Sequence, residues 1–181
     1  RIPFSEQDDR LLGPTTRSRW CYAESKALDE YLALAYSLER GLPVVIARLF
    51  NTVGPRQSGR YGMVLPRFVG QALEGQPLTV YGDGEQTRAF ADVRDVVQAL
   101  YSLAECPSAE GQVVNVGSDR EITINELARL VIQVTASKSK ISHVPYDQAH
   151  PAGFEETMRR VPDTARVRAL IGWQASISLE E

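Results

Sequence analysis

Hydrophobic residues recur at helical spacing from Trp20 to Arg40, and a short, continuous apolar run follows them. Within the first stretch the apolar positions include Leu28, Tyr31, Leu32, Ala35 and Leu38, and this spacing predicts an amphipathic helix. Gly41 and Pro43 come directly after it and place its end, since neither residue continues a helix well. Val44 to Phe50 has the pattern of a buried parallel strand.

The rest of the chain alternates between the two kinds of pattern, which predicts an α/β fold. Residues 1–19 and 51–61 are rich in loop-forming residues and predict loops. Strands are expected at 78–81, 88–91, 112–116 and 141–144. Helices are expected at 64–74, 92–105 and 124–135, with a last short one after Asp163 that ends at Gly172. Asp92 and Asp163 are the expected caps, and Thr123 with Glu126 forms a capping box.

Charge and composition exclude several classes of protein. A net charge of −3 argues against a nucleic-acid-binding protein. No apolar run approaches the roughly 20 residues that span a bilayer, so we expect no membrane partner. Cys21 and Cys106 have neither metal-ligand spacing nor a disulfide framework around them. We therefore expect no metal site, and a reducing, cytoplasmic location.

Tyr22 and Lys26 lie four residues apart on the predicted first helix, so their side chains share one face. An ammonium group beside a tyrosine stabilises the phenolate, which lets the tyrosine act as a general base and, in the reverse step, as an acid. Lysine is rare in this chain: Lys26, Lys138 and Lys140 are the lysines among 20 basic residues. The alternative is a surface tyrosine that happens to lie beside a surface lysine.

Three sequence segments, in this order along the chain, favour the catalytic interpretation of Tyr22 and Lys26. Residues 20–26 read Trp-Cys-Tyr-Ala-Glu-Ser-Lys, residues 47–55 read Ala-Arg-Leu-Phe-Asn-Thr-Val-Gly-Pro, and residues 78–88 read Leu-Thr-Val-Tyr-Gly-Asp-Gly-Glu-Gln-Thr-Arg. Together they resemble the extended short-chain dehydrogenase/reductase family, in its NAD-dependent nucleotide-sugar epimerase/dehydratase branch. Within that branch the likeness is to UDP-glucuronate decarboxylases and UDP-glucose 4-epimerases, and it runs along nearly the whole chain.

The resemblance implies a cofactor side of the site. Tyr22 would be the catalytic acid/base. Lys26 would support it and hydrogen-bond the ribose of the nicotinamide. Leu49 and Phe50, at the end of the strand, would lie beside the nicotinamide of NAD.

The resemblance also implies a substrate side, for a UDP- or dTDP-sugar. Asn51 would bond the diphosphate or the sugar. Val64 and Leu65, together with the strand from Thr79 to Tyr81, would enclose the nucleobase. Arg88 and Arg160 would hold the diphosphate, and arginine suits this role because its guanidinium offers paired donors.

Each substrate-side residue also has a structural interpretation. The structural alternative for Asn51 is the cap of a turn, for Tyr81 it is packing in a core, and for Arg88 it is a solvated strand residue. Arg159 competes with its neighbour Arg160 for the diphosphate.

The segments that are missing limit the interpretation. The family has a Gly-x-x-Gly-x-x-Gly loop after its first strand and a catalytic Ser/Thr, and neither is found here. We therefore expect a fragment that is inactive alone. Residues 1–60 would be a remnant of the NAD-binding Rossmann domain, and residues 61–181 mainly the nucleotide-sugar-binding domain. The fold would be the trailing part of a Rossmann-like parallel sheet plus a small α/β substrate-binding domain.

The implied reaction passes through a 4-keto sugar, which is then epimerised, decarboxylated or dehydrated. The alternatives are a UDP-sugar-binding module without catalysis, a structural remnant, and an ordinary dehydrogenase that releases its NAD. The predicted helix from Trp20 to Arg40 has apolar residues on more than one side. We therefore also expect a homodimer through this helix.

Overall fold

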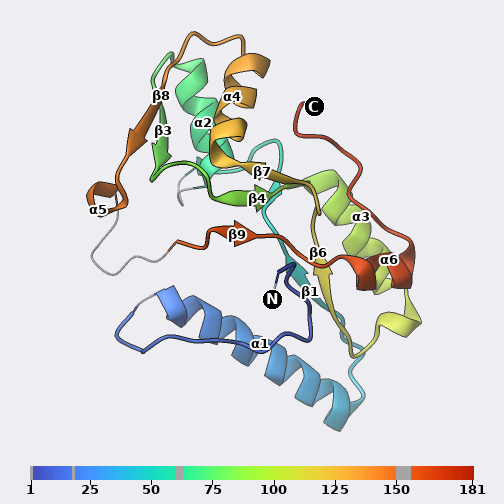
Figure 1. Cartoon of the computed structure of the whole chain (residues 1–181). Coiled ribbons are helices and arrows are strands. Elements are labelled where there is room, and N and C mark those ends of the chain that lie inside the picture. Colours follow the sequence, from blue (N-terminus) through green and yellow to red (C-terminus); the bar gives the residue numbers. More distant parts are fainter. Residues whose placement is uncertain (1, 18, 60–62, 150–155) are drawn as a thin grey trace.

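The computed structural model describes residues 2–17, 19–59, 63–149 and 156–181. Its longest element is helix α1 (Arg19–Arg40), which lies below the rest of the chain in Figure 1. Gly41 follows with φ 65°, the left-handed conformation in which glycine commonly ends a helix. Strand β1 (Ile46–Leu49) then runs parallel to β6 (Val113–Val116). The predicted helix and the predicted parallel strand are both confirmed, the strand being shorter than expected.

Four small sheets are present within the described ranges. Besides the β1–β6 pair, β2 (Thr52–Val53) pairs in parallel with β5 (Ala91–Asp92). β3 (Leu78–Tyr81) pairs in parallel with β8 (Ile141–Val144). The fourth sheet has the order β7-β4-β9 and contains β7 (Glu121–Thr123), β4 (Thr87–Ala89) and β9 (Arg159–Arg160).

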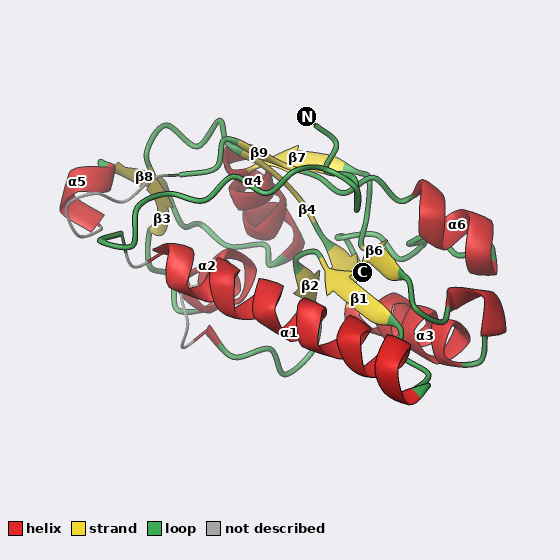
Figure 2. Cartoon of the chain, turned by 90° about the horizontal axis from the view of Figure 1, so that it is seen from below, coloured by secondary structure: helices red, strands yellow, loops and turns green. Residues whose placement is uncertain are grey.

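Four of the other helices lie in two groups, as Figures 1 and 2 show, and each group covers a hydrophobic core. One core lies under α2 (Val64–Leu73) and α4 (Ile124–Val134) and is built around Phe68, Leu78 and Leu127. The other lies between β6, α3 (Val93–Ala104) and α6 (Ala165–Ile171), with Trp173 in it. A short 3-10 helix at Pro107–Ala109 and the four-residue helix α5 (Tyr146–Ala149) complete the described elements.

Several local predictions need correction. The expected strand at 88–91 is two strands, β4 and β5, because the chain changes partner at Phe90 from β7 and β9 to β2. The loop predicted at 51–61 contains β2, and its last two residues lie outside the described ranges. The cap of α6 is Thr164 rather than Asp163, although the carboxylate of Asp163 still accepts the amide of Ala165 at 2.9 Å.

Other helix ends follow the sequence signals. Asp92 accepts the amide of Arg94 at the start of α3, and Thr123 with Glu126 makes the full capping box of α4. Gly172 ends α6 with φ 66°. These caps satisfy backbone groups that a helix leaves unpaired at its ends, and so they fix where α3 and α4 begin.

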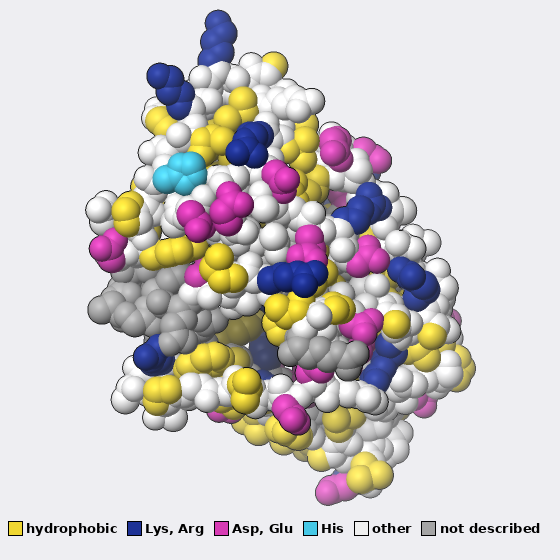
Figure 3. Space-filling model, viewed as in Figure 1, with side chains coloured by type: hydrophobic (Ala, Val, Ile, Leu, Met, Phe, Trp, Pro, Cys, Tyr) yellow, Lys and Arg dark blue, Asp and Glu magenta, His cyan; other side chains and the backbone are white. Residues whose placement is uncertain are grey.

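Helix α1 is weakly packed against the rest of the chain. Ala27 is the buried residue among its described side chains. Apolar side chains of the helix are instead exposed, among them Leu28, Tyr31, Leu32, Tyr36 and Leu38. Figure 3 shows hydrophobic atoms along the lower edge of the molecule, where α1 lies. None of the described helices is long and apolar enough to cross a membrane.

Candidate functional site

A pocket of about 560 Å³ opens between α2 and the strands β2, β3 and β4. Of the residues predicted to bind substrate, those that line it are Asn51, Val64, Leu65, Tyr81 and Arg88. They come from four different segments, and the fold brings them together. Thr79 and Arg160 are not among the lining residues. Thr79 contacts Arg67, which lines the pocket, and Arg160 contacts Phe50, which precedes Asn51.

One end of the pocket is an aromatic ring covered by a cation. The guanidinium carbon of Arg67 lies 4.2 Å from the centre of the Tyr81 ring. Nη2 of Arg67 also donates to the carbonyl of Thr79 at 3.1 Å, so Thr79 contributes its backbone rather than a wall of the pocket. Sequence reasoning missed Arg67. Its signal was available, since it is the charged residue of an otherwise uncharged helix, α2.

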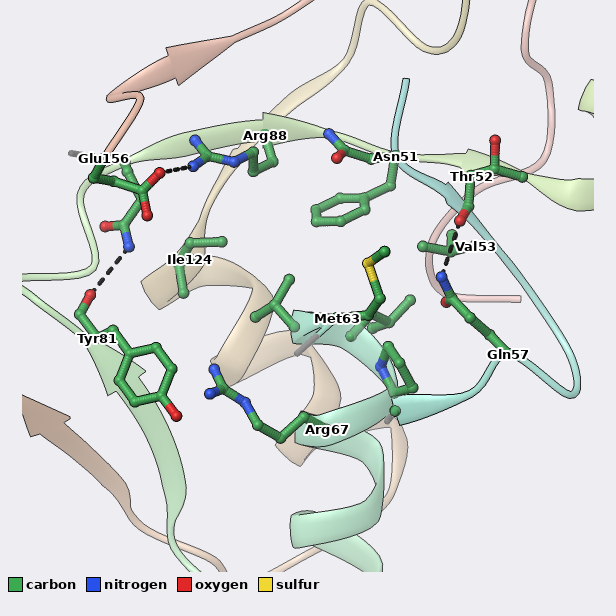
Figure 4. Close-up of a pocket in the computed structure, with 16 residues that line it drawn as sticks. Asn51, Thr52, Val53, Gln57, Met63, Arg67, Tyr81, Arg88, Ile124 and Glu156 are labelled. Atoms are coloured by element: carbon green, nitrogen blue, oxygen red, sulfur yellow. Dashed lines mark hydrogen bonds and ion pairs between the residues drawn. The ribbon is translucent and has the colours of Figure 1, made fainter. Parts of the chain in front are cut away.

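The other end of the pocket holds Arg88, on strand β4. Its Nη1 donates to the carbonyls of Thr87 and Thr157, each at 2.7 Å, and its Nη2 lies 2.5 Å from Oε1 of Glu156. The parallel pairing of β4 with β9 carries Glu156 to this position from far along the chain. Figure 4 shows Arg88 and Glu156 side by side at the top of the pocket and Tyr81 with Arg67 at the bottom.

Asn51 lines the same pocket with its side-chain amide already bonded within the fold. Its Nδ2 donates to the carbonyl of Ala89 at 2.9 Å, and its own carbonyl accepts the amide of Ala91. Its φ is 33°, a value that asparagine tolerates better than most residues. The side chain therefore ties the end of β1 to β4, and the backbone carbonyl ties it to β5, while the residue still lines the pocket.

Phe50 and Arg160 meet beside the pocket. Phe50 is 8% exposed and Leu49 is 45% exposed. The guanidinium carbon of Arg160 lies 5.6 Å from the centre of the Phe50 ring. Arg159, the competing residue, is bonded instead to Glu121 of β7. The structure thus places Arg160, not Arg159, against the residues that end β1.

Charged groups from other segments act on the pKa of Arg160. Surrounding atoms lower the pKa of Arg160 by desolvation, even though part of its side chain is open to solvent. The charge of Arg88 lowers this pKa further, whereas Tyr22 and Glu156 act in the opposite direction. Tyr22 is therefore near enough to Arg160 for its charge to act on this arginine.

Tyr22 and Lys26 both lie on the exposed surface of α1. Tyr22 is 72% exposed. The ammonium of Lys26 bonds Oδ2 of Asp29 at 2.7 Å. This hydrogen bond is the main reason why the pKa of Lys26 is raised, and the charge of Asp29 adds to it. The helix gives Tyr22 and Lys26 the predicted spacing, but the ammonium group of Lys26 binds the carboxylate of Asp29 rather than the phenol of Tyr22.

Comparison with known proteins identifies the family. The model of the NAD dependent epimerase/dehydratase family matches residues 2–117, which is more than half of the chain. The chain belongs to this family. A UDP-N-acetyl-alpha-D-glucosaminuronate decarboxylase of Bacillus cytotoxicus is 46% identical over 180 residues, which are 99% of this chain and 56% of that protein. UDP-glucuronic acid decarboxylase 1 of Xenopus tropicalis is 41% identical over 90% of this chain and 37% of its own length.

The family relationship extends to solved structures. An epimerase from Methanothermobacter thermautotrophicus superimposes with a TM-score of 0.88 at 28% identity, covering 100% of this chain and 51% of that one. The predicted α/β class with a Rossmann-like parallel part is thereby confirmed, as is the resemblance to this NAD-dependent family. The chain spans about half the length of the curated relatives it matches, or less.

Proposed function

We propose that this chain carries the catalytic helix and the nucleotide-sugar pocket of an NAD-dependent enzyme that acts on a UDP-sugar. The pocket is the observation that carries the proposal, because its two ends suit the two halves of a nucleoside diphosphate. The Tyr81 ring, held by Arg67, offers a face on which a nucleobase stacks. Nη2 of Arg88, at the other end, is a charge-assisted donor of the kind that binds phosphate oxygens.

The residues at the end of β1 and on α1 fit the nicotinamide end of NAD. Leu49 and Phe50 supply an apolar surface that is partly open, and Lys26 supplies an ammonium group for ribose hydroxyls. NAD supplies a hydride acceptor when it is bound. The Gly-rich loop that holds the pyrophosphate in this family does not occur in the sequence. The proposed contacts of this chain with NAD are therefore limited to the nicotinamide end.

Tyr22 is the proposed acid/base. It would accept the proton of the sugar 4-hydroxyl as that carbon is oxidised and return a proton on reduction. Its support requires that Lys26 leave Asp29. That exchange costs little, because both side chains are more than half exposed and exposed ion pairs contribute little to stability. Arg160 lies within electrostatic range of Tyr22.

Decarboxylation is the fate of the 4-keto sugar that the relatives favour. The relative that is 46% identical to this chain carries the name of a decarboxylase that acts on a UDP-linked uronate. A ketone at C4 places the C6 carboxylate in the β position, so the C5–C6 bond can break. Its electron pair then enters the ketone as an enolate, CO₂ leaves, and a proton is taken up at C5. Epimerisation and dehydration are the other outcomes of the same intermediate.

A UDP-sugar-binding module without catalysis is the second candidate. The Lys26–Asp29 bond and the exposed position of Tyr22 favour it, because neither catalytic group is preorganised in the described structure. The two candidates agree on the pocket and differ on α1. A substitution on α1 therefore distinguishes them only where turnover is measured.

The first test is calorimetric titration of the 181-residue chain with UDP, dTDP and uridine. We expect UDP to bind and Arg88→Ala to weaken it at least tenfold, because a charge-assisted contact to the diphosphate is lost. Uridine, which has no phosphate, should be unaffected by this substitution. Absence of Arg88-dependent UDP binding would refute the proposed pocket.

The second test is turnover. We expect no conversion of UDP-glucuronate by this chain with NAD, since the sequence lacks the Gly-rich loop and the catalytic Ser/Thr. Release of CO₂, followed by NMR of the sugar, would contradict that expectation. If CO₂ release were also lost in Tyr22→Phe, the role of Tyr22 would be supported and the binding-module alternative rejected.

The exposed apolar side chains of α1 support a proposed homodimer. Leu28, Tyr31, Leu32 and Tyr36 are each more than half exposed, and apolar surface of this kind is typically covered in a stable protein. Sedimentation velocity at tens of micromolar should show a dimer, and Tyr31→Glu should shift it to monomer. A wild-type chain that stays monomeric would contradict this proposal.

A further inference from the structure

The cationic end of the pocket is closed by a carboxylate of the chain itself. Oε1 of Glu156 lies 2.5 Å from Nη2 of Arg88, and the two side chains are only 23% and 15% exposed. The same oxygen accepts the amide of Thr157 at 2.8 Å. Both residues line the pocket, and Figure 4 shows the ion pair at its upper end. The donor best suited to an anionic ligand is thus already engaged.

The orientation of Arg88 does not depend on this ion pair alone. Nη1 is held by two carbonyls, those of Thr87 and Thr157, each at 2.7 Å. These bonds fix the guanidinium from the strand side, so its Nη2 edge would keep its direction if Glu156 turned away. Nη2 can therefore exchange one anionic partner for another without rebuilding the strand.

A phosphate and the carboxylate of Glu156 would repel each other if both bound the Nη2 edge of Arg88. Like charges repel strongly where solvent screening is poor, and both members of the pair are mostly buried. Arg160 is near enough for the charges of both Arg88 and Glu156 to act on it. Glu156 thus offsets part of the positive charge at this end of the pocket, and its departure would leave a site that favours a multiply charged anion.

We propose that Glu156 occupies the place of a ligand phosphate in the unliganded chain, and that a nucleoside diphosphate binds by exchanging it on Nη2 of Arg88. This inference rests on the proposed function and adds a residue that sets specificity. Glu156 lowers the affinity for every anion, so only ligands with enough negative charge displace it. It contributes nothing against a neutral nucleoside.

The test measures UDP, inorganic pyrophosphate and uridine binding to the wild-type chain and to Glu156→Gln. We expect UDP and pyrophosphate to bind about five- to tenfold more tightly to the variant, the effect of removing one partly buried competing ion pair. Uridine affinity should not change. A purely structural role for Glu156 would not raise the ratio of UDP affinity to uridine affinity, so this ratio is the decisive readout.

Glu121→Gln is the matched control. Glu121 also pairs with an arginine of β9, Arg159, but it does not line this pocket, so UDP affinity should be unchanged. Thermal melts verify that each variant is folded. Weaker or unchanged UDP binding in Glu156→Gln, with Arg88-dependent binding intact in the wild type, would overturn the exchange and leave the proposed function standing. Absence of UDP binding in both chains would overturn both.

Discussion

Glu30 of helix α1 and Arg48 of strand β1 form a two-point ion pair. Nε of Arg48 donates to Oε1 at 2.8 Å, and Nη2 donates to Oε2 at 2.7 Å. The side chain of Arg48 is 29% exposed and that of Glu30 is 19% exposed, so the pair is shielded from much of the solvent. Because Ala27 is the buried residue among the described side chains of α1, this pair is a main tie between the helix that carries Tyr22 and the strand that ends at the pocket.

Arg48→Met should loosen α1 without unfolding the rest of the chain. The substitution keeps the apolar stem but leaves Glu30 without its partner, at a cost of about 1–2 kcal/mol. That cost corresponds to hydrogen exchange about five- to thirtyfold faster for the amides of α1. Exchange measured by mass spectrometry should show this change in peptides from α1, while peptides from α3 keep the wild-type rate.

Arg94→Met is the control for this prediction. Arg94 also pairs with a carboxylate, that of Asp92, but its side chain is 58% exposed and its partner is two residues away. Exchange in α1 should therefore remain at the wild-type rate. Equal exchange in α1 of the wild type and of Arg48→Met would show that other contacts hold the helix.

Acid should remove the contribution of the same pair. The hydrogen bond from Arg48 is the main cause that lowers the pKa of Glu30 below the ordinary glutamate value of about 4.3. A lowered folded-state pKa means that the stabilisation is fully present above pH 4.3 and is lost as pH falls through the lowered value. The difference in free energy of unfolding between wild type and Arg48→Met, from urea titrations, should therefore shrink below pH 4.3. A difference that grows on acidification would contradict this account.

The sequence predicted those features whose cause is local. The capping box of Thr123 and Glu126 and the left-handed Gly172 depend on a few neighbouring residues. The strand Leu78–Tyr81 was predicted with its observed bounds, and a short run rich in β-branched and aromatic residues beside turn residues is typical of a strand. The side of the pocket formed by Tyr81 and Arg88 followed from the resemblance of this segment to a known family.

The contacts that close the site could not be predicted in this way. Glu156 and Arg88 are 68 residues apart, and they meet because the two-residue strand β9 pairs with β4. Such a short strand has no pattern of its own, and its register is set by tertiary structure. The pairing of Lys26 with Asp29 rather than with Tyr22 was missed for a simpler reason. At helical spacing several partners compete, and the sequence does not rank them.

Asp95→Asn should destabilise the chain as a whole. Asp95 is 4% exposed, and its two carboxylate oxygens accept the amides of Ser176 and Ile177 and the hydroxyl of Ser176. Asparagine keeps one acceptor oxygen but no charge, so the charge-assisted bonds from the two amides weaken and the hydroxyl of Ser176 has to turn to accept from the new NH₂ group, which costs about 2–4 kcal/mol. The melting temperature should fall by about 5–15 °C.

Asp119→Asn serves as the comparison. Asp119 makes an exposed contact of 3.5 Å with Arg168, so its replacement should shift the melting temperature by no more than about 2 °C. Similar shifts in both variants would mean that the segment around Ser176 contributes little to folding.

Arg67→Met should weaken UDP and uridine binding equally, by about fivefold. The guanidinium of Arg67 lies 4.2 Å from the Tyr81 ring and is anchored to the carbonyl of Thr79; without it the ring loses a contact worth about 1 kcal/mol. The loss falls at the nucleobase end of the pocket, so phosphate should not alter it. Calorimetry with both ligands tests this, with Arg129→Met, an exposed position on α4, as control. A loss confined to UDP would instead place Arg67 at the diphosphate and reverse the proposed orientation of the ligand.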